Sequence, residues 1–182
     1  MSGLVDHFRA MARNNAWSNY RLLEACAQLR AGEYEAPRVG FFPSLKETLN
    51  HILMVDGYYI DSLEGRDDAL DRANAFTPHA AVAALTEAQR TSDRRLLAYC
   101  DSLEPGRLEA PVTLRREGRT APLETVRQVL PHLFIHQVHH RGQAHAMLSS
   151  TSVKPPQLDE FFLLDELPLR RDELRALGLP ET

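Results

Sequence analysis

Three histidines in two distant segments have the side-chain type and spacing of a metal site. His136 and His140 stand four residues apart, so on a helix they share one face and can bind a single ion. His51 lies far upstream and is a candidate third ligand. Three protein ligands leave coordination positions free for water or substrate, which is typical of catalytic rather than structural metal sites. The pair alone also arises by chance on surface helices.

The residues around the pair limit the chemistry further. Gln137 follows His136, so the pair does not belong to the His-Glu-x-x-His motif, which carries its own glutamate base. On a helical wheel Gln143 lies about 20° from His136, so its side chain is a candidate to fix an imidazole by a hydrogen bond. Arg141 points about 140° away, where an ion pair or a helix contact is expected. His145 lies about 180° away and is expected to face solvent.

Two residues that follow His51 are further candidates for the same pocket. Asp56 interrupts an apolar stripe, where a lone buried carboxylate is costly. One interpretation is a general base or a support for a ligand. The other is a buried carboxylate bonded to Trp17, Asn19 or an arginine, which its direction, about 140° from His51, favours. Tyr58 lies about 20° from the direction of His51 and is a candidate to line the pocket, with aromatic packing as the alternative.

Four helical patterns must position these side chains. The helical period of apolar residues occurs in four stretches, over residues 4–29, 44–65, 77–103 and 122–148. Ser44 and Glu47 form a capping box at the start of the second stretch. Thr77 and Pro78 are start signals for the third. Pro131 is expected to kink the fourth helix, because proline removes a hydrogen bond from the helical ladder.

Shorter elements complete the predicted architecture. Residues 111–120 alternate apolar and polar side chains around Glu117–Gly118, which predicts a small hairpin before the fourth helix. A short amphipathic stretch at residues 169–177 lies in the C-terminal tail. Four long helices with modest connections predict an all-α four-helix bundle that forms a single domain over residues 1–182.

Composition argues against several classes of function. The net charge of −4 and the isoelectric point near 6.1 do not suggest a protein that binds nucleic acid or membrane surfaces. No stretch of about 20 apolar residues predicts a transmembrane helix, and the N-terminus lacks the pattern of a signal peptide. Cys26 and Cys100 are too few for a disulfide framework and are expected to be core residues. A cytoplasmic location is therefore expected.

The histidine segments resemble a known family. Asn50-His51-Ile52-Leu53 and His136-Gln-Val-His-His140-Arg-Gly-Gln143 are similar to the DinB/YfiT-like family of small bacterial metalloproteins, and Asn15-Ala-Trp17-Ser-Asn19-Tyr20 resembles its first helix. The resemblance covers essentially the whole chain. It implies a four-helix bundle in which His51, His136 and His140 bind a divalent metal ion, often nickel or zinc. His139 is then an extra histidine beside a ligand position, and we treat it as a spectator.

Two functions follow from the resemblance. Some members of the wider group resemble thiol-dependent S-transferases and isomerases, which implies a metal-dependent enzyme that activates a low-molecular-weight thiol, or water, for attack on a small electrophile. The alternative is a metal-binding stress protein without turnover. Direct DNA binding is a third hypothesis, which the acidic chain disfavours. Trp17 lies off the apolar stripe of the first helix, and related bundles often pair, so we expect a homodimer.

Overall fold

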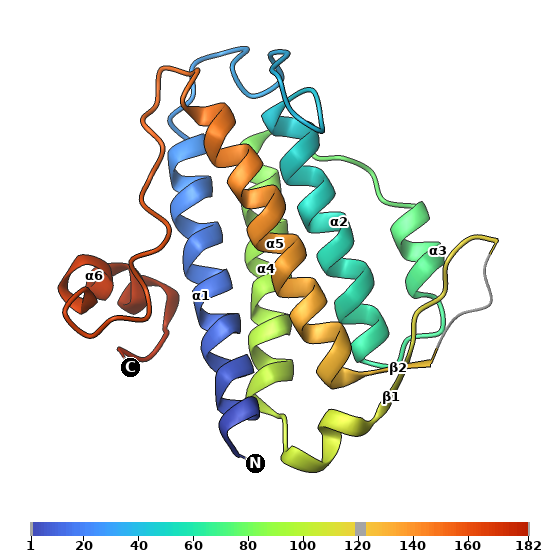
Figure 1. Cartoon of the computed structure of the whole chain (residues 1–182). Helices are drawn as coiled ribbons and strands as arrows, with labels where there is room; N and C mark the ends of the chain where they lie inside the picture. The colour runs from blue at the N-terminus through green and yellow to red at the C-terminus, as the bar shows by residue number, and fades with distance from the viewer. Residues whose placement is uncertain (1, 119–122, 182) are drawn as a thin grey trace.

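The computed structural model describes residues 2–118 and 123–181. Four long helices run side by side as a bundle (Figure 1). They are α1 (Ser2–Cys26), α2 (Leu45–Leu63), α4 (Val82–Asp101) and α5 (Val126–Leu148). The predicted all-α bundle is confirmed. None of the helices in the described ranges is long and apolar enough to cross a membrane.

The start of α2 shows why this segment folds as the sequence predicts. Ser44 is the N-cap residue in an extended conformation, and its hydroxyl oxygen accepts a hydrogen bond of 3.2 Å from the Glu47 backbone N–H. That bond satisfies one of the amides that every helix N-terminus leaves without a helical partner. The helix ends before Gly65, whose φ of 79° is one that glycine adopts without steric cost. Local signals therefore fix the helix that carries His51.

The third predicted helix begins later than its sequence signals indicate. Thr77 and Pro78 precede α4 but lie outside it, and Ala81 is the N-cap residue, without a side-chain hydrogen bond. A short helix, α3 (Ala69–Asn74), lies before this connection and was not predicted. The fourth helix, α5, runs through Pro131 without interruption. The cost is one ladder hydrogen bond, because the proline nitrogen cannot donate to the Arg127 carbonyl.

The predicted hairpin is present but longer than expected. Strand β1 (Pro111–Thr113) pairs antiparallel with β2 (Leu123–Thr125), so the second strand lies beyond the predicted range. Glu117 and Gly118 form a turn. Pro122, the predicted start of the fourth helix, lies outside the described residues, as does Thr120. The helix itself begins at Val126, because the residues before it pair as a strand.

Two apolar clusters fill the two ends of the bundle. One contains Phe8, Ile60, Leu96 and Leu133, and the other contains Leu22, Leu49, Leu85 and Met147. Each cluster takes side chains from all four long helices. Between them, at the middle of every long helix, stand buried polar residues: Asn15, Asn19, Asp56, Gln89, Asp93, Gln137 and Arg141. We call this set the polar layer.

The C-terminal segment covers Trp17. Helix α6 (Leu167–Leu177) lies against the outside of α1, at the left in Figure 1. Trp17 is 0% exposed, packs against Phe161 and Leu174, and donates a hydrogen bond of 2.6 Å from its indole N–H to Glu173. The tail of the same chain therefore buries the side chain from which a dimer was predicted. That reason for expecting a dimer is removed.

Candidate metal centre

The structure brings the three predicted histidines together at one point between α2 and α5. His51 Nε2 and His136 Nε2 are 3.1 Å apart. One nitrogen from each of His51, His136 and His140 lies within 4.8 Å of the other two. The rings of His51 and His140 meet nearly edge to face, with centroids 4.6 Å apart. Three imidazoles at this spacing could hold one metal ion.

A hydrogen bond orients His140 toward the other two rings. Its Nδ1 lies 2.8 Å from Gln143 Oε1. An amide oxygen only accepts, so Nδ1 carries the proton and Nε2 keeps its lone pair. The sequence interpretation of Gln143 as a partner of an imidazole therefore agrees with the contact, although the ring that it holds is that of His140 rather than His136. Nδ1 of His136 is buried without a hydrogen-bond partner among the described residues.

The environment keeps these imidazoles neutral. Burial, with His140 nearby, lowers the pKa of His51 to about 4. Burial, and to a lesser extent the neighbouring histidines, lower the pKa of His136 to about 3. The pKa of His140 is also lowered, mainly by burial. Neutral imidazole is the form that binds a metal ion, so the site does not require the loss of three protons near neutral pH.

An aromatic loop lies beside the three rings. The Phe42 ring centroid is 4.5 Å from that of His51 and 5.7 Å from that of His140. Phe41 packs edge to face on Phe42 and lies 6.1 Å from His140. Sequence analysis missed both phenylalanines, because the loop that carries them has no periodicity to indicate which side chains face the site.

Other predicted residues make their hydrogen bonds outside the three rings, although the His139 ring packs on that of His140 with centroids 4.8 Å apart. The Tyr58 hydroxyl donates a hydrogen bond of 2.6 Å to the Arg115 carbonyl, and its ring packs on Tyr59. His145 is only partly exposed, because its Nε2–H donates to the Pro156 carbonyl of the tail at 2.8 Å. The expectation that it faces solvent is therefore wrong. His139 is exposed, and its Nε2 lies 3.0 Å from Gln143 Nε2.

Asp56 belongs to the polar layer. It is 1% exposed, and its Oδ2 accepts hydrogen bonds from Gln137 and, at 2.9 Å, from Gln89. The interpretation as a buried, hydrogen-bonded carboxylate agrees with these contacts, but the expected partners were wrong. Asp56 reaches the site only indirectly, because Gln137 is the neighbour of His136 in α5.

Hydrogen bonds among its own members satisfy nearly all the polar side-chain atoms of the polar layer. Arg141 donates hydrogen bonds of 2.6 Å to Asn15 and 3.0 Å to Asn19. The same two asparagines donate to Asp93 Oδ1, and Gln89 joins Asp93 to Asp56. Gln89 and Asp93 were not predicted. They stand four residues apart on the apolar face of α4, and this spacing of two polar residues could have identified them as a buried pair.

The charges in the polar layer are unequal. Burial raises the pKa of Asp56 and of Asp93 to about 7, and for Asp56 the nearby Asp93 acts in the same direction, whereas Arg141 and the amide donors oppose the rise. Burial lowers the pKa of Arg141 to about 10, which still leaves the guanidinium charged at neutral pH. One buried cation faces two buried carboxyl groups. The layer is neutral when one of the two carboxyl groups holds a proton.

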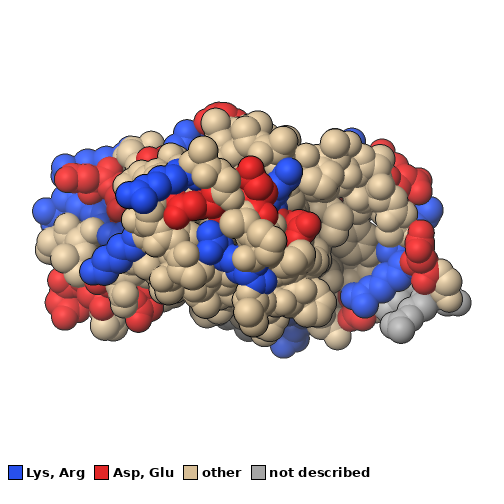
Figure 2. Space-filling model, turned by 90° about the horizontal axis from the view of Figure 1, so that it is seen from above, with Lys and Arg blue, Asp and Glu red and all other residues tan. Residues whose placement is uncertain are grey.

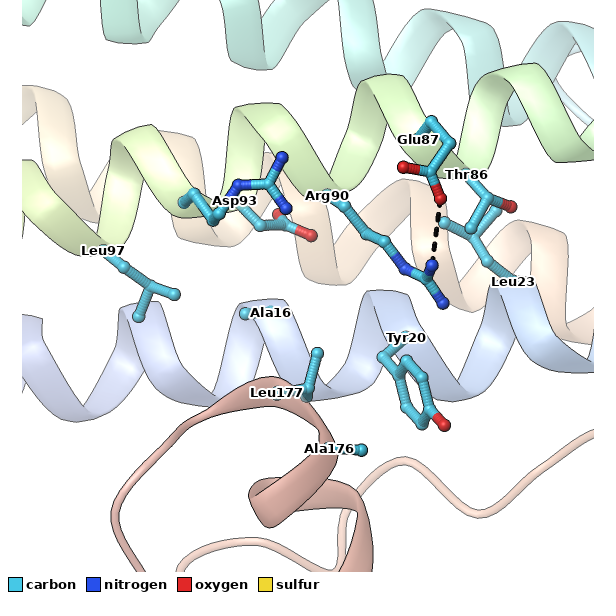
Figure 3. Close-up of a pocket in the computed structure, with 11 residues that line it drawn as sticks. Ala16, Tyr20, Leu23, Thr86, Glu87, Arg90, Asp93, Leu97, Ala176 and Leu177 are labelled. Atoms are coloured by element: carbon cyan, nitrogen blue, oxygen red, sulfur yellow. Dashed lines mark hydrogen bonds and ion pairs between the residues drawn. The ribbon is translucent and has the colours of Figure 1, made fainter.

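A cavity of about 360 Å³ lies on the other side of the polar layer, between α1, α4 and α6. Figure 3 shows Asp93 and Arg90 reaching toward it from α4, with Tyr20 and Leu177 on the facing elements. No residue of α2 or α5 lines it. The cavity is therefore separate from the three histidines, and Asp93 is the residue that the cavity shares with the polar layer.

These features define a class of protein, a helical bundle with a three-histidine cluster between two of its helices. A family model described as "DinB family" matches residues 1–170. The chain is also similar to "Protein DinB" of Bacillus subtilis (strain 168), with 26% identity over 140 residues, which is 74% of this chain and 80% of that relative. The chain belongs to the DinB family.

Proposed function

We propose that the protein binds one divalent metal ion, nickel or zinc, through His51, His136 and His140, and uses it in catalysis. The reaction class is attack of a low-molecular-weight thiol, or of water, on a small electrophile. The observation that carries the proposal is the convergence of three imidazole nitrogens within 4.8 Å, one of them oriented by Gln143.

The donor set fits such an ion. Each histidine offers a neutral nitrogen, and no carboxylate is part of the cluster. Three neutral ligands leave the full positive charge of the ion uncompensated, and an ion of this kind lowers the pKa of a thiol or water molecule that reaches its open position. His51 and His136 are only partly buried, so a small molecule can approach them.

The residues of the chain have distinct roles in this proposal. The three histidines hold the ion, and Gln143 fixes the tautomer of His140. The hydrogen bond from Gln137 to Asp56 ties α5 to α2 beside the cluster, which is a structural role separate from metal binding. Cys26 and Cys100 take no part, since both are buried and burial raises the pKa of each thiol to about 12.

The test combines metal analysis with a turnover screen. Purified protein is expected to contain close to one nickel or zinc ion per chain, as measured by inductively coupled plasma mass spectrometry. Thiol transfer to small electrophiles, and their hydrolysis, should require the ion and return when metal is added to chelated protein. Full metal content without turnover would instead support a metal-binding stress protein. Chelated protein with unchanged turnover would place the chemistry elsewhere.

Homodimer formation and a cytoplasmic location also remain proposals. With Trp17 covered by α6, the dimer rests on the apolar side chains that α5 leaves exposed, Ile135 and Val138. Basic and acidic side chains are interspersed on the end of the molecule seen in Figure 2, which is not the surface expected of a nucleic-acid-binding protein. Light scattering at micromolar concentration tests the association, and a monomeric mass would refute it.

A further inference from the structure

The loop before α2 presents apolar side chains to solvent directly beside the three histidines. Phe41 is 75% exposed and Val39 is 102% exposed, whereas Phe42 is partly buried and its ring packs on that of His51. Leaving a large apolar side chain in water is unfavourable relative to burying it. Phe41 is the exposed ring of the two phenylalanines, and its centroid lies 6.1 Å from that of His140, one of the proposed ligands.

The loop is held firmly, so the position of Phe41 is not incidental. Arg38 donates hydrogen bonds to the Ser150 carbonyl (3.0 Å) and hydroxyl (2.8 Å) beyond the end of α5. Its backbone N–H donates to the Pro43 carbonyl at 2.7 Å, which closes the loop on itself. Gly40 lies so close to α5 that a Cβ atom there would overlap the terminal methyl group of Met147.

A second clamp ties the start of the same loop to the same end of α5. Glu33 accepts hydrogen bonds from the Ser152 backbone N–H and from the Ser152 hydroxyl, both at 2.7 Å. Both clamps connect the loop to the residues that follow α5, and α5 carries His136 and His140. The two phenylalanines and these ligands are therefore fixed to one element and keep their relative positions.

We propose that Phe41 and Phe42 form an aromatic platform that selects ligands of the metal ion carrying an aromatic or other planar apolar group. The proposal rests on the proposed function, because it assigns the class of molecule that the open metal position accepts. An ion lies about 2.0–2.1 Å from each imidazole nitrogen. The Phe41 and Phe42 centroids lie 6.1 and 5.7 Å from that of His140. A ring one or two bonds from the coordinating atom therefore reaches the platform.

The expected size of the preference follows from aromatic contacts. Two aromatic rings in an edge-to-face or offset arrangement contribute about 0.5–1.5 kcal/mol beyond the apolar area that they bury, and a tenfold preference corresponds to about 1.4 kcal/mol. We expect the platform to favour an aromatic ligand over a small polar one by about tenfold. Phe42 is also packed against His51, so Phe41 is the residue to substitute.

The test measures ligand binding rather than turnover. Protein loaded with Co²⁺ is titrated with phenylmethanethiol and with 2-mercaptoethanol, two alkyl thiols, and separately with phenylacetate and acetate, and the cobalt absorption bands report each Kd. The wild type is expected to bind the aromatic member of each pair about tenfold more tightly. Phe41→Ala should reduce that preference to less than about twofold, with unchanged Co²⁺ affinity. Phe162→Ala, which removes an exposed ring from the tail, is the matched control.

The outcomes separate the platform from the proposed function. If neither thiol binds but phenylacetate is preferred over acetate, thiol activation fails and the platform stands. If both thiols bind equally well to the wild type, the platform is overturned and the open metal position stands. A preference that survives Phe41→Ala also overturns it. So does a Phe41→Ala protein that changes from dimer to monomer with its preference intact, because the loop would then cover a second copy of the chain.

Discussion

The polar layer and the histidine cluster stand side by side in the bundle, yet their buried polar groups differ in how they are hydrogen-bonded. In the polar layer, donors face acceptors: the amides of Asn15, Asn19 and Gln89 donate to carboxylates, and Arg141 donates to amide oxygens. In the cluster, three imidazoles converge, and only one pair of nitrogens is within hydrogen-bond distance. Within the layer, Asp56 Oδ1 is the one buried polar side-chain atom without a partner among the described residues, whereas the cluster has several lone pairs that a cation would satisfy.

This difference distinguishes a structural network from a binding site. Both regions contain groups with strongly shifted pKa values, so a shift alone does not identify function. Whether donors and acceptors are matched is the better criterion. By that criterion Asp56 and Arg141 belong to a network that stabilises the bundle, and the three histidines form a ligand-binding site. The predictions below test that division, beginning with the largest expected effect.

Substitution of one ligand should nearly abolish metal binding. His51→Ala removes one of three donors and the only one from α2, so we expect metal affinity to fall by more than about 100-fold, beyond the loss typical of residues that merely support a ligand. His136→Ala and His140→Ala should behave alike. His145→Ala, on the same helix but bonded to the tail, is the control and should retain its metal. Full occupancy in the His51→Ala protein would refute the three-histidine site.

Substitution in the polar layer should instead lower stability. Arg141→Met leaves two buried carboxyl groups without their cation, and the loss of one partner from a buried charged network costs about 3–5 kcal/mol. Urea denaturation measures the free energy of unfolding. Arg94→Met, an exposed position on α4, serves as control and should change it by less than about 0.5 kcal/mol. A stable Arg141→Met protein that has lost its metal would show that the layer and the cluster are not separate in function.

The hydrogen bond between Gln143 and His140 should contribute less to metal affinity than a ligand histidine does. Gln143→Ala frees the His140 ring to adopt either tautomer, and loss of such a partner typically weakens metal binding by about 10–100-fold. Calorimetric titration with Zn²⁺ measures the change. Gln28→Ala, which removes an exposed amide that donates to the Glu24 carbonyl of α1, is the matched control. Unchanged zinc affinity in Gln143→Ala would mean that packing alone orients His140.

The sequence predicted what local signals control. Helical periodicity located four long helices, and the spacing of His136 and His140 on α5, with the resemblance of the His51 segment to a known family, located the three residues that the structure brings together. Ser44, the predicted cap, is the N-cap residue of α2, which begins at Leu45. Each of these features depends on residues within one or two helical turns of one another. Residues at that spacing are neighbours on a helix, so the sequence alone predicts their proximity.

What the sequence did not predict depends on contacts between distant segments. Trp17 lies off the α1 stripe, and only the docking of α6 shows that its own chain covers it. Thr77 and Pro78 are good start signals, yet α4 starts at Val82, because the tertiary context overrides local preference. The position of Phe41 depends on clamps between the loop and residues more than a hundred positions away. No periodicity in one segment encodes such pairings.

The smallest effect that we expect is a pH dependence that belongs to the polar layer alone. Burial raises the pKa of Asp93 to about 7, well above its ordinary value. Between about pH 4 and pH 7 the folded protein therefore keeps a proton that the unfolded chain has lost. Stability from this group is fully present below about pH 4 and is lost as the pH rises through about 7. Asp93→Asn keeps an oxygen for its three amide donors and cannot titrate.

The stability of the wild type relative to Asp93→Asn should accordingly fall by roughly 2 kcal/mol from pH 5 to pH 8, since one unit of pKa shift corresponds to about 1.4 kcal/mol and Asp56 shares the titration. Urea denaturation of both proteins at each pH measures the difference. Asp67→Asn, at an exposed carboxylate, should show no such trend. A difference that is constant across this range would mean that Asp93 does not hold the proton. The neutrality of the polar layer would then need another source, and its separation from the histidine cluster would have to be argued from hydrogen bonds alone.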